Sequence, residues 1–180
     1  MGKPFNKELA RKSAEKTKEL VSKLNNVLSK FEVKVGPLKD HDISLVCRAN
    51  RSVEVHVELE VVRSDRWRRI REEFTTVRWP IAKKEKCEEY MRRNRVLIMM
   101  SVDENLTEMF FVECDKWVNE GGEERALAVR AGGKVYRYRK GGEERFWAIS
   151  KDKVVWCKVE ECPQLEEYIL RVLNEKGYEC

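Results

Sequence analysis

Apolar and polar residues follow two different periods along this chain, and each period predicts a different kind of element. From Phe5 to about Phe31 the apolar residues recur mostly at helical spacing, with Lys and Glu between them, which predicts one long amphipathic helix. A second helical pattern, "PQLEEYILRVLNEK", has Pro163 in its first turn and stops at Gly177. Helices are therefore expected near both ends of the sequence.

Alternation with a period of two predicts a β-hairpin after the first helix. The stretches "DHDISLVCR" and "VEVHVELEVV" both alternate, and the turn-like "ANRS" joins them. In the second stretch Val and Leu side chains face one way, while the other face carries Glu54, His56, Glu58 and Glu60. The runs "VLIMMSV" and "EMFFVEC" are nearly continuous in apolar residues, which predicts two buried strands at the centre of the core.

The remaining segments have weaker patterns. Arg, Trp and Lys are mixed up to Trp79, which predicts an irregular segment, and a short helix is expected from about Ile81 to Arg93 because Pro80 breaks any longer one. Three Gly-Gly turns after residue 118 separate short strands around "LAVR", "VYRYR", "RFWAIS" and "KVVWCKV". The order of helix, hairpin, helix, strands and helix predicts an α/β or α+β fold.

Composition sets limits on this picture. A chain of 180 residues, 42% of them hydrophobic, is expected to form a single domain over residues 1–180. Its 37 basic and 32 acidic residues give a net charge of only +5, which indicates a surface of mixed charge and not a polybasic tail. A charged fraction of 38% with both signs is common in proteins of heat-loving organisms. No stretch resembles a signal peptide or a membrane span, so a soluble, cytoplasmic protein without a membrane partner is expected.

Six cysteines are spread along the chain without a C-x-x-C pair. They are Cys47, Cys87, Cys114, Cys157, Cys162 and Cys180. In an intracellular protein this spacing favours free, partly buried thiols over a zinc site or a set of disulfides. A redox or metal role is disfavoured even for the closest two, because no second pair or nearby His completes a tetrahedral ligand set.

The carboxylates of the hairpin are the main candidate for chemistry. Asp42 lies on the polar face of the first strand, so it is expected to meet one or two of the glutamates on the second strand. Carboxylates that close repel one another, and Mg²⁺ bound to them offsets the repulsion. The alternative is an antiparallel strand whose polar face is simply solvated, as such patterns commonly are.

The order of these elements resembles the core of the PD-(D/E)XK nuclease superfamily, which includes restriction endonucleases and archaeal Holliday-junction resolvases. The resemblance consists of a Glu-bearing helix, an Asp at the start of a strand, a Glu-bearing strand paired with it, a helix and two apolar strands, over roughly Lys7 to Cys114. It implies a restriction-endonuclease-like α/β core at about residues 5–118, with helices beside a mixed central sheet. A β-rich extension and a closing helix would follow at about residues 119–180.

The resemblance also implies specific site residues. The motif's Asp would be Asp42 and its acidic strand residue Glu58, and these two would bind Mg²⁺ or Mn²⁺. The motif has a lysine two residues later, where this sequence has Glu60. Some restriction enzymes use E-x-E at this point, and in other members the lysine has moved to the following helix, where Lys83, Lys84 and Lys86 are candidates.

Further positions correspond less well to the motif. His41 stands where a proline commonly precedes the Asp, and the helix-one glutamate could be Glu8, Glu15 or Glu19, each of which could equally belong to a solvated helix face. His56 could contact a phosphate or act as an auxiliary base, and its ordinary alternative is a half-exposed strand residue.

The implied activity is a metal-dependent endonuclease acting on DNA, as in an archaeal or viral resolvase. The two metal ligands would orient an attacking water, and Glu60 or a nearby lysine would position or deprotonate it. Symmetric cutting of two strands would call for a homodimer. The alternatives are a non-catalytic nucleic-acid-binding relative that keeps the fold and, from a third class, a protein-interaction subunit.

A basic segment from Arg63 to Arg95 is the candidate DNA-binding surface. Its six candidate phosphate ligands are Arg66, Arg68, Arg69, Arg78, Arg92 and Arg93, interleaved with the possible stacking residues Trp67, Trp79 and Tyr90. The alternative is that neighbouring glutamates, from Glu72 to Glu89, neutralise the arginines while the tryptophans belong to the core. A second candidate surface is the later ladder of Arg137, Arg139 and Lys140 with its two tyrosines.

Overall fold

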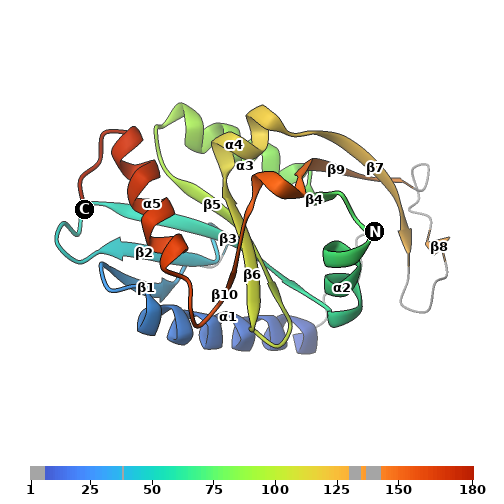
Figure 1. Cartoon of the computed structure of the whole chain (residues 1–180), viewed down its shortest axis with the longest axis horizontal. Coiled ribbons are helices and arrows are strands. Elements are labelled where there is room, and N and C mark those ends of the chain that lie inside the picture. The colour runs from blue at the N-terminus through green and yellow to red at the C-terminus, as the bar shows by residue number, and fades with distance from the viewer. Residues whose placement is uncertain (1–6, 38, 130–134, 137–142) are drawn as a thin grey trace.

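A six-stranded mixed sheet forms the centre of the protein, with helices on both of its faces (Figure 1). The structure, a computed structural model, describes residues 7–37, 39–129, 135–136 and 143–180. The strand order is β1-β2-β3-β5-β6-β10; β3 and β5 run parallel, and the other neighbouring pairs are antiparallel. The strands are β1 (Phe31–Val35), β2 (Ile43–Cys47), β3 (Glu54–Val62), β5 (Leu97–Asp103), β6 (Glu108–Glu113) and β10 (Val155–Lys158).

Helices α1 (Lys7–Val27) and α5 (Pro163–Glu175) pack against one face of this sheet. Leu20, Leu24 and Leu28 recur every fourth residue, so they line one side of α1 and its end and are almost completely buried. The two terminal helices predicted from the sequence are confirmed, although the first ends before Phe31, which is the first residue of β1. The short strand β1 was not predicted, because its first residue, Phe31, continues the helical spacing of the preceding segment.

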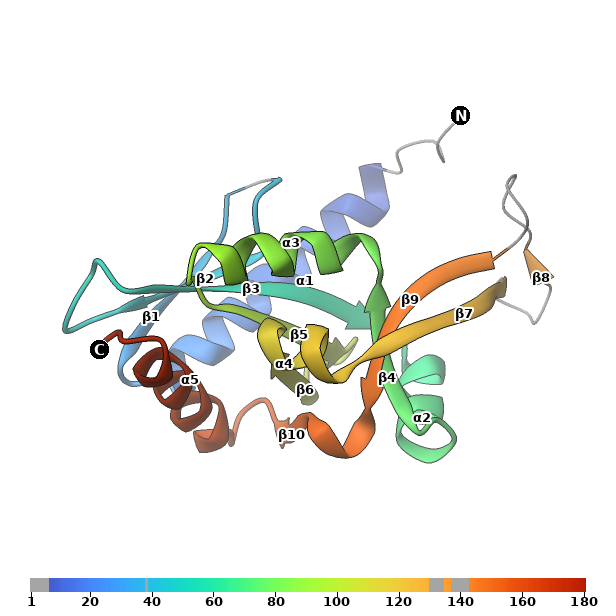
Figure 2. The same ribbon diagram turned by 90° about the horizontal axis from the view of Figure 1, so that it is seen from above.

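The opposite face is covered by three helices and a second sheet (Figure 2). These helices are α2 (Ser64–Glu72), α3 (Ala82–Arg92) and α4 (Cys114–Glu120). The second sheet has the order β4-β9-β7-β8, built from β4 (Thr76–Pro80), β9 (Glu143–Ser150), β7 (Gly122–Val129) and β8 (Val135–Tyr136). Since β4 comes from the first half of the chain and β10 joins the main sheet, the C-terminal third is interleaved with the rest. The fold class is mixed α/β.

The expectation of an irregular segment up to Trp79 is wrong. Trp67 and Ile70 lie three residues apart on α2 and are buried, and the ring of Trp67 stacks on Phe110 of β6 with centroids 5.4 Å apart. Val77 and Trp79 point to the same side of β4 and are buried in the same apolar cluster as Trp67 and Ile70. The many arginines between these residues obscured the helical period of α2 and the alternation of β4. Burial of the large aromatic side chains is what holds this segment in its regular structure.

The outer edge of β1 is covered by a side chain. Asn25 of α1 donates from Nδ2 to the carbonyl oxygen of Val33 and accepts the Val33 N–H at Oδ1, both at 2.8 Å. It thereby satisfies two backbone groups that an edge strand would otherwise offer to another strand. The surface of β1 that stays available is its face, not its edge.

The expectation of free thiols is wrong for four of the six cysteines. Disulfides join Cys47 to Cys180 and Cys157 to Cys162, with Cα atoms 5.6 Å apart in each pair. The other two cysteines are free and buried. The first disulfide links residues 133 positions apart, and only the fold brings them together. Within the described residues no helix is long and apolar enough to cross a membrane.

Candidate active site

Asp42 and Glu58 lie next to each other where β2 and β3 run side by side. Asp42 precedes β2, and its backbone N–H donates to the carbonyl oxygen of Val57 at 3.1 Å. Its carboxylate oxygen Oδ2 accepts the N–H of Leu59 at 2.8 Å, and the two carboxyl groups are within hydrogen-bonding reach of each other. The antiparallel register of the hairpin therefore brings together the two residues that the resemblance assigns to the metal.

Two lysines of α3 reach Glu58. Lys83 Nζ lies 3.1 Å from Oε2, and Lys86 Nζ contacts Oε1 in a close ion pair. Residues three apart share a helix face, so one carboxylate can receive both ammonium groups. Lys84 points elsewhere: it pairs with Glu88 at 2.9 Å and lies over the ring of Trp147. Lys84, named with Lys83 from the sequence, is thus not part of this cluster, and Lys86 is.

The two carboxyl groups differ in proton affinity. Burial raises the pKa of Asp42, and the neighbouring Glu58 raises it further. Burial acts in the same direction on Glu58, but the hydrogen bonds and charges of Lys86 and Lys83 outweigh it and lower the pKa of Glu58. When a proton enters this pair, it therefore resides on Asp42 while Glu58 stays ionised.

The other predicted acidic residues have different partners. Glu60 is on the same face of β3, where it pairs with Arg66 at 3.4 Å and accepts a hydrogen bond from Ser101 at 3.3 Å. Among the helix-one candidates, Glu8 pairs with Lys12 at 3.6 Å and Glu15 with Arg11 at 3.8 Å; Glu19 is exposed. Helix α1 packs on the opposite face of the sheet from Glu58, so these glutamates belong to its solvated surface.

The polar face of β3 is not solvated, contrary to the alternative expected for such a strand. Glu58 is 5% exposed and His56 is 3% exposed. The ring of His41 stacks on His56, with centroids 3.4 Å apart and planes 10° apart, and Tyr90 of α3 contacts His56 Nδ1 through its hydroxyl at 2.6 Å. The chain approaches His41 so closely that a Cβ on Gly36 would lie 2.7 Å from the ring.

This histidine pair was not predicted as a unit, because one ring comes from a loop and the other from a strand. His41 Nδ1 bonds Asp40 at 2.8 Å, and Nε2 bonds Ser44. Ligand atoms of Asp40, His41 and His56 lie within 4.8 Å of one another, a donor set that suits a transition metal better than Mg²⁺. Both ring nitrogens of His41 and Nδ1 of His56 already form hydrogen bonds with protein groups, so the three side chains need no metal ion to satisfy them.

The predicted DNA-binding surface is largely neutralised. Ion pairs join Arg66 to Glu60, Arg68 to Glu72, Arg69 to Glu73, Arg78 to Glu124 and Arg93 to Glu89, at 2.9 to 3.4 Å. Among the described residues, only Arg92 of the six candidates has no carboxylate partner. The expected stacking residues Trp67, Trp79 and Tyr90 are buried, so the prediction that they contact bases is wrong. The ladder of Arg137, Arg139 and Lys140 lies outside the described residues.

Comparisons with known proteins do not assign the chain to a family. No protein-family model matches the sequence, and no curated protein matches it.

The burial of His56 predicts an acid-sensitive contribution to stability. Burial lowers the pKa of His56 to about 4, with the charges of His41 and Arg95 acting in the same direction. The unfolded chain binds this proton near pH 6.5, so the contribution is complete above that pH and is lost as pH falls towards 4. The difference in unfolding free energy between the parent and His56→Gln should shrink by about 2 to 3 kcal/mol from pH 7.5 to 4.5, measured by urea titration.

Glu113 provides a control of opposite sign. Burial raises the pKa of Glu113 to about 7, so the folded protein binds this proton before the unfolded chain does. The stability difference between the parent and Glu113→Gln should therefore move in favour of the parent as pH falls over the same range. Equal pH profiles for the parent and both variants would contradict these assignments.

Proposed function

We propose that this protein is a Mg²⁺-dependent nuclease that hydrolyses phosphodiester bonds in DNA. The observation that carries the proposal is the buried Glu58 carboxylate, adjacent to Asp42 on one side and to the ammonium groups of Lys83 and Lys86 on the other. Paired carboxylates with a nearby lysine are the groups that the resemblance to PD-(D/E)XK nucleases implies. The lysine is supplied by α3 in place of the strand position that Glu60 occupies.

The donor set fits a hard divalent cation. Asp42 and Glu58 offer carboxylate oxygens, the ligands that Mg²⁺ and Mn²⁺ prefer. Burial, and secondarily the charge of Glu58, raises the pKa of Asp42, so a second negative charge at this position is disfavoured in the protein alone. A cation held between the two would relieve that repulsion. When bound, Mg²⁺ would neutralise charge developing on the phosphate and lower the pKa of an attacking water.

The order of the elements also supports the proposal. Helix α1, the antiparallel strands β1, β2 and β3, helix α3 and the parallel strand β5 follow one another around the main sheet, with Asp42 before β2 and Glu58 on β3. This agrees with the helix, Asp-bearing strand, Glu-bearing strand, helix and apolar strands from which the resemblance was drawn. Helix α2 and strand β4 are inserted between β3 and α3.

The lysines would have distinct roles. Lys83 is 44% exposed and Lys86 is 25% exposed, while their common partner Glu58 is buried beneath them. A lysine carries its charge on a flexible four-carbon chain, so Lys83 can exchange the carboxylate for a phosphate oxygen of an incoming substrate. Lys86 would stay on Glu58 and keep that carboxylate ionised and oriented. Glu60 forms an ion pair with Arg66, so it could position the attacking water only if substrate binding broke that pair.

A non-catalytic nucleic-acid-binding protein is the second candidate, and one observation favours it. Two ammonium groups, those of Lys83 and Lys86, contact the buried Glu58 carboxylate. Together with Asp42 the cluster has two cations and two carboxyl groups, so it needs no metal for charge balance and could bind a phosphate group through its lysines. Such a protein would bind DNA with strong salt dependence and would give no metal-dependent products.

Cleavage assays with and without metal test the proposal. The protein is incubated with labelled duplex, four-way junction and single-stranded DNA in Mg²⁺, Mn²⁺ or EDTA, and size-exclusion chromatography of the same sample reports its oligomeric state. Products that form with Mg²⁺ and disappear with EDTA are expected. Binding to any of these DNAs without products in either metal would contradict the nuclease and support the second candidate.

A further inference from the structure

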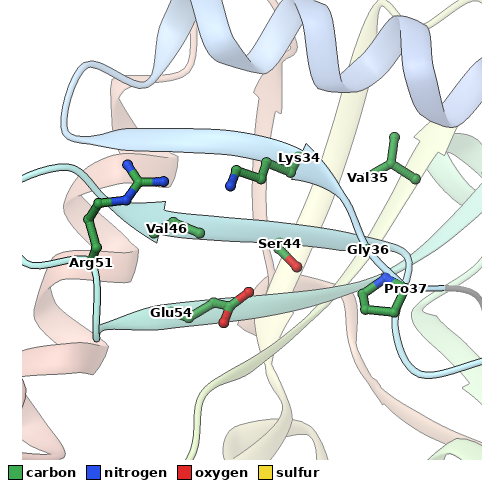
Figure 3. A pocket seen from close by; sticks show the side chains of 8 residues that line it. All are labelled: Lys34, Val35, Gly36, Pro37, Ser44, Val46, Arg51 and Glu54. Atoms are coloured by element: carbon green, nitrogen blue, oxygen red, sulfur yellow. The ribbon is translucent and has the colours of Figure 1, made fainter.

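The face of β1 and β2 next to the carboxylate cluster carries an open groove (Figure 3). The groove has a volume of about 510 Å³ and is formed by residues of the β1–β2 hairpin and the start of β3. Its lining residues are Lys34, Val35, Gly36, Pro37, Ser44, Val46, Arg51 and Glu54. A cavity of this size suits a ligand as large as a nucleotide rather than a single ion.

One end of the groove lies at the loop that carries Asp42, a residue of the proposed active site. Ser44 lies in the floor of the groove and bonds His41, the residue before Asp42. At the same end Gly36 donates its N–H to the carbonyl oxygen of Asp42 at 2.8 Å. The stacked rings of His41 and His56 lie between this end of the groove and Glu58, so a chain leaving the groove would pass over these rings to reach Asp42 and Glu58.

Cations outnumber carboxylates on the β1 side of the groove. Lys34 and Arg51 both pair with one carboxylate, that of Glu32, at 3.4 and 2.9 Å, which leaves one positive charge in excess. The strand ladder continues one step past the strand ends, where the Arg48 N–H donates to the Lys30 carbonyl oxygen at 2.9 Å.

Alternation along the two strands places Lys30 on the face of Lys34, and Arg48 on the face of Val46. Within the part of the chain that the structure describes, neither the Lys30 ammonium group nor the Arg48 guanidinium group has a carboxylate partner, although the Lys30 backbone N–H donates to Glu166 Oε1 at 2.7 Å. The β1–β2 hairpin is thus cationic, in contrast to helices α2 and α3, where the arginines predicted to bind DNA are mostly paired.

The walls of the groove suit a base. Pro37 and Val46 offer apolar surface. Ser44 and Glu54 add a hydroxyl group and a carboxylate that could accept hydrogen bonds from exocyclic amino groups. Figure 3 shows Lys34 and Arg51 extending on the β1 side, with Glu54 on the β3 side.

We propose that this groove binds an unpaired strand of nucleic acid and delivers it to Asp42 and Glu58. Phosphates of the strand contact Lys34 and Arg51, and a base packs against Val46 and Pro37. The class of ligand rests on the proposed function. The groove accepts a single strand because a base held in a duplex stack cannot present its face to these side chains.

Binding by the Asp42→Asn protein, in which cleavage is disabled, tests the inference. Fluorescence anisotropy measures its affinity for a labelled single-stranded DNA 12-mer, the same sequence as RNA, and a 12-base-pair duplex, at 50 to 300 mM salt. Adding Lys34→Gln and Arg51→Gln should weaken single-strand binding roughly tenfold and reduce the salt slope by about 1.4, since each phosphate contact contributes about 0.7.

The pair Arg68→Gln and Arg69→Gln is the matched control, because it removes the same charge from the neutralised surface of α2. It should leave single-strand affinity within about twofold. Unchanged binding by the groove variant, equal losses in the control, or a duplex bound as tightly as the single strand would overturn the inference. A cleavage assay distinguishes this inference from the proposed function. If the parent protein cleaves no DNA and the groove variant nevertheless loses binding, the nuclease proposal is wrong and the groove is still the binding site.

Discussion

Asp42→Asn is expected to abolish Mg²⁺-dependent cleavage while leaving the protein at least as stable as the parent. Loss of a residue that merely orients a metal ligand already costs 10- to 100-fold, so loss of a ligand should exceed about a hundredfold. Stability should not fall, because an Asn oxygen can still accept the Leu59 N–H and the repulsion from Glu58 disappears. Initial cleavage rates and urea unfolding at pH 8 measure the two effects.

Two pairs of residues provide controls for this result. Asp40→Asn changes a neighbouring carboxylate that bonds His41 and is not a proposed ligand, so cleavage should persist. Lys83→Gln should slow cleavage strongly, whereas Lys84→Gln, one residue further along α3, should not, because Lys84 contacts Glu88. An Asp42→Asn protein that cuts at the parent rate, or a Lys84→Gln protein as impaired as Lys83→Gln, would contradict the assigned site.

The hairpin and its carboxylates were accessible from the sequence because both depend on local alternation. A period of two fixes which side chains of β2 and β3 share a face, so the pattern alone predicts that Asp42 meets one or two glutamates of β3. The choice of Glu58 among them came from the resemblance. The strands β5 and β6 were equally clear, since a short, nearly continuous apolar run bounded by turn residues is typical of a strand buried on both faces.

The lysines of the site were not resolved because their role depends on the rotation of a helix about its own axis. The sequence alone does not distinguish Lys83, Lys84 and Lys86. Successive residues of a helix are rotated by about 100° about its axis, so two of the lysines face Glu58 and one faces Trp147. The rotation of α3 about its axis is set by the burial of Cys87 and Tyr90, which pack into contacts that no local sequence pattern reveals.

The basic segment was misjudged although a local signal was present. Arg68 and Glu72, Arg69 and Glu73, and Glu89 and Arg93 are spaced i and i+4, which on a helix predicts ion pairs between neighbouring side chains. Once these segments are recognised as helices, the spacing predicts that the glutamates neutralise the charge of the arginines. The cations of the groove are scattered over residues 30–51 and form one surface only through strand pairing.

The C-terminal disulfide is expected to be the larger of two covalent contributions to stability. Cys47 and Cys180 close a loop of 133 residues, whereas Cys157 and Cys162 close one of five. If a disulfide acts mainly by restricting the unfolded chain, these loops correspond to about 5 and about 2 kcal/mol. Cys180→Ser should therefore lower the free energy of unfolding by about 3 kcal/mol more than Cys157→Ser.

Both replacements are placed at the more exposed partner, so that each buried thiol, Cys47 or Cys162, stays as a small apolar group. Hydrogen bonds that hold the C-terminal tail, such as that from the Tyr178 hydroxyl to the Asn94 carbonyl oxygen, are unchanged, so the loss reports on the covalent link. Urea titration without reductant measures the parent, the two single variants and the variant that combines Cys157→Ser with Cys180→Ser. A strong reductant should bring the parent to the stability of the combined variant. Equal losses in the two variants would show that restriction of the unfolded chain does not dominate.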